Sequence, residues 1–273
     1  MKLQDKLIEL RREKKAILAA NFYNLETLQA VVGGAIDASA PIILQLSEGS
    51  INYIGLEMAV KMAKTALEES GVEGWLHLDH GSSIALVQRC LDAGFDSVMI
   101  DASEKPMEEN IKVSAQAVRM AESYGANVEA ELGYIAKLNQ QQEHSGFTQP
   151  GDALRFTEET GVNALAVSIG TAHGFYKEEP KLDIELLGRI RDAVETPLVL
   201  HGSSGVPDKS IVLAIQNGIT KINLATETKN AFMQKLKSDL LSTDEIDLRI
   251  VFPRATEAAR ELIRKKIQIM ALA

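Results

Sequence analysis

The chain has 273 residues and a mass of 29.7 kDa, and its 45% hydrophobic and 25% charged residues are typical of an ordinary globular protein, which excludes the disordered, collagen-like and coiled-coil classes. Acidic residues (38) outnumber basic ones (29), and the net charge of −9 disfavours the phosphate contacts that a nucleic-acid partner requires. The N-terminal segment lacks the apolar core of a signal peptide, and no run of roughly 18 apolar residues could span a membrane, so we expect a cytoplasmic protein with neither nucleic acid nor membrane as its partner.

Short apolar runs alternate with amphipathic helical patterns along the whole chain, after a first amphipathic helix over 1–15. The predicted strands are 16–21, 41–46, 75–79, 97–101, 127–132, 164–169, 197–201 and 220–224. The helix predicted after each strand spans, in order, 25–39, 55–70, 83–94, 106–125, 153–161, 183–195, 208–218 and 227–242. Eight nearly continuous apolar strands separated by single helices predict an α/β fold, a closed parallel TIM (β/α)8 barrel over 1–273 as a single domain.

An open dinucleotide-binding sheet is disfavoured, because no glycine fingerprint follows the first strand. One long irregular stretch, 133–151, interrupts the regular alternation between the fifth strand and the next helix. Long loops in compact domains are usually functional or disordered, and we expect His144, which lies within this one, to be solvated.

Polar residues gather where the predicted strands end, and in a barrel these positions form the active face. His80, His173 and His201 end or closely follow three different strands. Three neutral imidazoles are a common ligand set for catalytic zinc, so the sequence predicts a zinc site. His77 lies on the same side of its strand as Asp79 but deeper, which favours a supporting role.

Two turns rich in glycine and hydroxyl residues, 201–207 and 221–228, each follow a strand and open a helix. Backbone N–H groups at a helix N-terminus attract anions, and barrels often bind phosphate after the seventh and eighth strands. The two turns therefore predict a phosphorylated substrate.

Several motifs resemble the class II metal-dependent ketose-bisphosphate aldolases, the fructose- and tagatose-bisphosphate aldolase family. The motifs are, in chain order, HLDHGSS, VEAELG, SIGTAHGFY, LVLHGSSGVP and TKINLATE. The resemblance implies reversible cleavage of a ketose phosphate or bisphosphate to dihydroxyacetone phosphate and an aldehyde such as glyceraldehyde 3-phosphate. It also implies Zn²⁺ as the cofactor, with a monovalent cation as a candidate second ion, and a homodimer or homotetramer.

The resemblance assigns roles to individual positions of this sequence. His80, His173 and His201 match the zinc ligands, Glu131 matches an alternative ligand, and Asp79 matches the acid that exchanges the proton of the substrate hydroxyl. The positions that match contacts to dihydroxyacetone phosphate are Asn21, Ser47, Gly174, Gly202, Ser203, Ser204, Asn223, Leu224, Ala225 and Thr226.

The sequence departs from the family pattern at several positions. The loop after ELG lacks the family's glycines and acidic pair, which leaves Glu143 as the nearest candidate for the loop base. Ser203 and Ala102 stand where the family frequently has glycine. We therefore expect that the substrate preference differs from that of typical family members. The DLR triplet resembles the family's DPR, so Arg249 is a candidate contact for a second phosphate, with Arg254 as its competitor.

Alternative functions remain open at this point. Within the same family the substrate could be a different ketose phosphate, such as a deoxyketogluconate phosphate. The altered loop also suits a non-catalytic subunit of an aldolase complex. A Schiff-base aldolase with Lys221 as its lysine would leave the three histidines unexplained. A metal-dependent hydrolase on the same barrel is set aside, because such barrels favour two histidines separated by one residue on the first strand, where this chain has Asn21.

Overall fold

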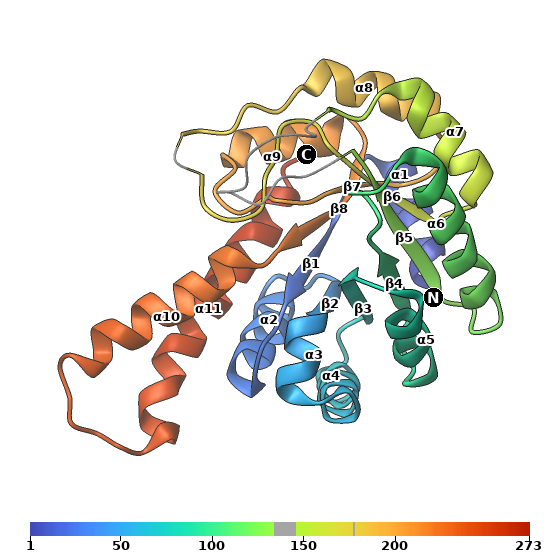
Figure 1. The fold of residues 1–273 in the computed structure, drawn as a ribbon. Helices are drawn as coiled ribbons and strands as arrows, with labels where there is room; N and C mark the ends of the chain where they lie inside the picture. The colour runs from blue at the N-terminus through green and yellow to red at the C-terminus, as the bar shows by residue number, and fades with distance from the viewer. Residues whose placement is uncertain (134–145, 177) are drawn as a thin grey trace.

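The computed structural model describes residues 1–133, 146–176 and 178–273. Eight parallel strands form a closed barrel in which each strand pairs with the next and β8 pairs with β1 (Figure 1). The strands are β1 (Ile17–Asn21), β2 (Ile42–Ser47), β3 (Gly74–Gly81), β4 (Ser97–Ile100), β5 (Asn127–Leu132), β6 (Ala164–Val167), β7 (Leu198–Leu200) and β8 (Ile219–Leu224). The predicted single-domain TIM barrel is confirmed.

Helices surround the barrel and connect its strands. They are α1 (Leu3–Glu13), α2 (Leu25–Asp37), α3 (Glu48–Ile54), α4 (Leu56–Ser70), α5 (Ile84–Asp92), α6 (Met107–Glu122), α7 (Pro150–Thr160), α8 (Ile184–Ala193), α9 (Asp208–Gln216), α10 (Thr226–Leu240) and α11 (Leu248–Met270). Side-chain caps begin several of them, as at Asn24, Ser47 and Asp183. None of the helices in these described ranges is long and apolar enough to cross a bilayer.

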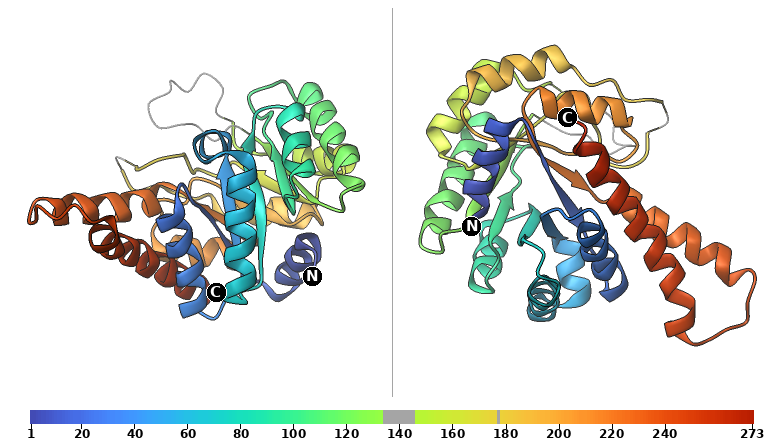
Figure 2. Two further views of the ribbon diagram at one scale, coloured as in Figure 1. Left: turned by 90° about the horizontal axis from the view of Figure 1, so that it is seen from below. Right: turned by 180° about the vertical axis from the view of Figure 1, so that it is seen from behind.

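The connections differ from the prediction at two places. A short extra helix, α3, follows β2 and is separated from α4 by Gly55, which has a φ of +90°. The last two helices, α10 and α11, form an antiparallel arm that projects from the barrel, in orange and red in Figures 1 and 2. The inner part of the arm packs against α2.

Strand alternation gives the barrel a polar interior at one end. On β5, Val128 and Ala130 belong to the core between strands and helices, so Glu129 and Glu131 point into the barrel. The same alternation on β3 and β8 turns polar side chains inward while Leu78 and its apolar neighbours pack outward. The candidate chemistry therefore lies inside the barrel.

Helix α1 closes the opposite, N-terminal end of the barrel. Its buried residues Leu3, Leu7 and Leu10 form one apolar cluster with Ile17, Trp75 and other inward residues from the first part of the strands. The N-terminal opening is filled by this cluster, so only the C-terminal end is left for a substrate.

We expect Leu7→Ala to lower the free energy of unfolding by about 2–5 kcal/mol, because it removes a side chain that is 0% exposed at the centre of this cluster. Gln4→Ala, an exposed position on the same helix, should change it by less than about 0.5 kcal/mol. Urea denaturation followed by circular dichroism measures both. Equal effects of the two substitutions would show that α1 does not support the barrel.

Candidate active site

Two consecutive residues of β3, Asp79 and His80, both face the C-terminal opening of the barrel. Neighbouring residues of a regular strand point to opposite faces, but the register of β3 against β4 shifts between Leu78 and Gly81. His80 has a left-handed backbone there, with a φ of +50°. Gly81 lacks the Cβ that would lie 2.5 Å from the Met99 carbonyl oxygen. This bulge turns His80 toward the same opening as Asp79.

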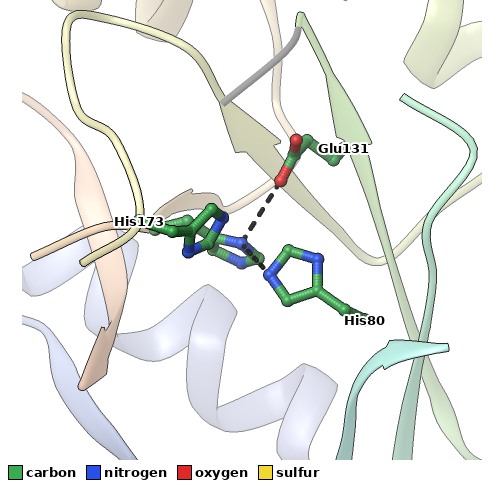
Figure 3. A group of neighbouring side chains, drawn as sticks. His80, Glu131 and His173 are labelled. Carbon is green, nitrogen blue, oxygen red and sulfur yellow. Dashed lines mark hydrogen bonds and ion pairs between the residues drawn. The ribbon is translucent and has the colours of Figure 1, made fainter. Parts of the chain in front are cut away.

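Three imidazoles and one carboxylate converge at this opening (Figure 3). Nε2 of His80 lies 3.1 Å from Nδ1 of His201, which lies 3.3 Å from Oε2 of Glu131. The ring centroid of His173 is 4.9 Å from that of His80. One ligand atom from each of the four residues lies within 4.8 Å of the others. Three nitrogens and one oxygen at this spacing fit the four-ligand, tetrahedral preference of Zn²⁺.

Neighbouring groups orient these rings. Nδ1 of His80 lies 2.6 Å from Oδ2 of Asp101, which leaves Nε2 facing the other histidines. Burial, together with the His80 and His201 rings, lowers the pKa of His173 to about 3. His173 is therefore neutral near pH 7 and keeps the lone pair that a metal ligand needs.

Asp79 is a buried carboxylate beside the histidine cluster. It accepts hydrogen bonds from the side-chain amides of Asn21 (2.8 Å) and Asn223 (3.2 Å) and lies 3.9 Å from Nε2 of His80. Burial alone raises the pKa of Asp79, but the His80 and His201 rings and the Asn21 amide outweigh it and hold the pKa below its ordinary value. Asp79 is thus an ionised proton acceptor at neutral pH.

The two turns predicted to bind phosphate are joined to each other by hydrogen bonds. The Ser203 hydroxyl donates to the Asn223 carbonyl oxygen, so this side chain fastens the β7–α9 turn to the end of β8. Gly202 has a φ of +65°, and a Cβ there would lie 2.5 Å from the Ala172 carbonyl oxygen. Ser204 accepts a hydrogen bond from the Glu227 backbone N–H. The two turns therefore form one connected surface.

The other predicted phosphate contacts lie near these turns or elsewhere at the C-terminal end. Ala225 precedes α10 as its cap residue and offers no side-chain acceptor, whereas the Leu224 side chain is buried in the outer core. Ser47 ends β2 and accepts a hydrogen bond from the Ser50 N–H, in register with Asp79 on the neighbouring strand. Gly174 directly follows His173 and has a φ of +107°.

Some predicted residues are not brought to this site. Arg249 is the second residue of α11, which begins at the outer end of the arm, and within the described part of the chain it pairs with Asp247, with an Nη2–Oδ2 distance of 2.7 Å. Its side chain is 89% exposed. Arg254 lies on the same helix. Glu143 and His144 lie outside the described residues.

No role was predicted for Asp101, Glu129 or Glu227 from the sequence. Glu227 accepts a hydrogen bond from the Gly205 N–H at 2.6 Å, which holds the β7–α9 turn against α10. The same carboxylate pairs with Lys266 on α11 at 3.0 Å. Glu129 and Lys221 form a buried pair below the histidines. The alternation of polar and apolar residues in NVEAEL and TKINL was the available signal for inward-facing side chains.

Comparisons with known proteins agree with this geometry. The family model for class-II fructose-bisphosphate aldolases matches residues 1–273. The solved structure of the YdjI aldolase from Escherichia coli K12 is 34% identical, with a TM-score of 0.89, over 98% of this chain and 96% of that one. A Coccidioides immitis protein assigned as a fructose-1,6-bisphosphate aldolase is 28% identical, with a TM-score of 0.91, over 99% of this chain and 96% of that one.

The Campylobacter jejuni fructose-bisphosphate aldolase Fba shares the fold, with 23% identity and a TM-score of 0.84 over 98% of this chain and 94% of that one. The family match spans the same residues that build the barrel and its cluster of histidines. This chain therefore belongs to the class-II fructose-bisphosphate aldolase family and is a carbon–carbon lyase.

Proposed function

We propose that this protein is a zinc-dependent aldolase that reversibly cleaves a ketose phosphate or bisphosphate to dihydroxyacetone phosphate and an aldehyde such as glyceraldehyde 3-phosphate. The observation that carries the proposal is the cluster of His80, Glu131, His173 and His201, whose ligand atoms lie within 4.8 Å of one another beside the Asp79 carboxylate. The donor set suits zinc, and class-II aldolases are generally zinc-dependent.

In the proposed reaction the ligand cluster would hold the metal ion, and Asp79 would transfer the proton. A divalent ion held by the cluster supplies positive charge that stabilises the negative charge left on the dihydroxyacetone phosphate fragment when the carbon–carbon bond breaks. Asp79 accepts the proton of the hydroxyl whose carbon becomes the aldehyde, and it returns that proton in the condensation direction. Asn21 and Asn223 hold the Asp79 carboxylate by donating to its two oxygens.

The joined turns supply the phosphate end of the site. The N-terminus of α10 and the β7–α9 turn present backbone N–H groups, and a helix N-terminus attracts a phosphate through these groups and its dipole. The Ser203 hydroxyl already donates to the Asn223 carbonyl oxygen, so it is not free to bind phosphate. Phosphate would therefore be bound by the backbone N–H groups of this turn. Gly202 and the backbone of 223–226 are then the contacts to dihydroxyacetone phosphate.

The test is a steady-state screen of the zinc-loaded protein against fructose, tagatose and deoxyketose phosphates, with one or two phosphate groups each. We expect cleavage of at least one ketose phosphate, loss of activity with a chelator, and recovery with zinc. The relative kcat/KM values identify the substrate. Full activity of chelated protein, or trapping of a covalent adduct by borohydride with substrate, would contradict the proposal.

We further propose that the protein acts as a homodimer or homotetramer and that the arm mediates this assembly. The described part of the arm exposes six large apolar side chains: Met233, Leu240, Leu241, Ile246, Leu248 and Ile250. Exposed apolar patches of this kind are typical of association surfaces. Arg249 lies among them, and in such an assembly the arm of one copy would place it at the barrel opening of another, where it would contact a second phosphate.

We expect the double substitution Leu241→Glu with Ile246→Glu to convert the oligomer into a monomer of 29.7 kDa, because it places charge on two side chains that are 91% and 89% exposed in one copy. Size-exclusion chromatography with light scattering measures the mass. Leu154→Glu, on α7 and 40% exposed, is the matched control and should keep the mass of the unmodified protein. A monomeric unmodified protein would contradict the assembly proposal.

A further inference from the structure

A buried ion pair lies inside the barrel beneath the histidine cluster and has no part in the chemistry proposed above. Nζ of Lys221, on β8, lies 2.8 Å from Oε2 of Glu129, on β5, and both side chains are 0% exposed. Removing two such charges from water costs several kcal/mol for each ion, and an apolar pair of similar volume is often at least as stable. Stability alone therefore does not explain this pair.

The other oxygen of Glu129 contacts a predicted metal ligand. Oε1 lies 2.8 Å from Nε2 of His201. An ionised carboxylate only accepts hydrogen bonds, so Nε2 carries a proton, and Nδ1 is the nitrogen that has to supply the lone pair to a metal. That Nδ1 is the atom that lies 3.1 Å from Nε2 of His80 and 3.3 Å from Glu131. The contact with Glu129 thus selects the nitrogen that faces the ligand cluster.

On the described strands, Glu129 supplies the hydrogen-bond acceptor close to Nε2 of His201. The Asn223 side-chain nitrogen lies 3.0 Å from the same Nε2, but it is a donor that also reaches Asp79. A donor favours the opposite tautomer, with an unprotonated Nε2. The Glu131 carboxylate, 3.3 Å from Nδ1, likewise favours a proton on Nδ1 when no cation occupies the cluster, so Glu129 competes with both Asn223 and Glu131 for the position of the His201 proton.

Lys221 holds the Glu129 carboxylate in the orientation that directs one of its oxygens at Nε2 of His201. It occupies Oε2, which leaves Oε1 directed at His201, and it supplies the counter-charge to a fully buried anion. The ammonium is itself held by His77, whose Nε2 lies 3.4 Å away and whose Nδ1 lies 2.7 Å from the Ser97 hydroxyl. The lysine is thus anchored by a third strand.

We propose that Lys221 and Glu129 are positioning residues that hold His201 with its proton on Nε2 and its Nδ1 available to the metal. The inference rests on the proposed function, since it assigns the support of the same zinc site. Residues that support metal ligands in this way typically contribute 10–100-fold to metal affinity. We expect Lys221→Met to weaken zinc binding by about that factor.

Rescue by a second substitution separates this role from a merely structural one. Glu129→Gln in the Lys221→Met protein removes the unpaired charge and keeps a side-chain oxygen that accepts from Nε2 of His201. The double variant should therefore bind zinc more tightly than Lys221→Met alone. Thr220→Val is the matched control, because Thr220 is buried on the same strand and donates only to the Leu198 carbonyl oxygen.

Two measurements test the proposal: competition of each variant with a chromogenic chelator for zinc, and ¹⁵N NMR of the histidines in the zinc-loaded unmodified protein. We expect His201 to carry its proton on Nε2, zinc affinity to fall in Lys221→Met and recover in the double variant, and Thr220→Val to bind normally. A His201 proton on Nδ1, an unchanged affinity of Lys221→Met, or no recovery in the double variant overturns the proposal. If the unmodified protein binds no zinc at all, the proposed function fails instead.

Discussion

His173→Ala should abolish tight zinc binding and lower kcat/KM by about 10³-fold or more. Three histidines and Glu131 form the ligand cluster, and the loss of a metal's charge stabilisation is worth several kcal/mol, at about 1.4 kcal/mol for each factor of ten. His173 is the most informative of the three, because His80 and His201 also bind Asp101 and Glu129 and their loss disturbs those partners. Zinc content after dialysis and steady-state kinetics measure the two effects.

The control for this substitution is Lys181→Ala, an exposed position on the same connection between β6 and α8. Adding zinc should restore chelator-treated unmodified protein and the control, but not His173→Ala. If His173→Ala keeps both its zinc and its activity, the cluster of imidazoles is not the metal site.

The sequence was sufficient to predict the barrel and the end at which its chemistry lies. Eight apolar strands separated by helices have few ways to close, and the fold places strand ends together regardless of their distance along the chain. Three histidines at such ends therefore had to meet. The structure confirms the barrel and brings all three within one cluster that also includes Glu131.

The features that escaped prediction depend on backbone detail or on contacts across the barrel. The left-handed conformation of His80 arises from a local register shift, and nothing in the letters HLDHG specifies it. The pairing of Glu129 with Lys221 depends on which inward side chains of β5 and β8 reach the same depth. α11 begins at Leu248 and contains Pro253, a residue that usually marks a helix boundary.

Asp79→Asn should lower kcat for cleavage by about 10²–10⁴-fold while zinc affinity stays close to that of the unmodified protein. The amide keeps the size of the carboxyl group but does not accept a proton at neutral pH, so it removes general acid–base catalysis. Asp79 is outside the ligand cluster, and its carboxylate is 3.9 Å from the nearest ligand atom of His80. Single-turnover kinetics at saturating zinc measure the chemical step.

Asp101→Asn, a substitution of a neighbouring carboxylate, should have the opposite effect: weaker zinc binding with most of kcat retained. Asp101 contacts Nδ1 of His80 at 2.6 Å, so its loss should weaken zinc binding by about 10–100-fold and leave most of kcat at saturating zinc. The two aspartates lie on adjacent strands or just beyond them, so a general disturbance of the barrel opening would affect both variants alike. If Asp79→Asn loses zinc instead of kcat, Asp79 supports the metal ligands and another group moves the substrate proton.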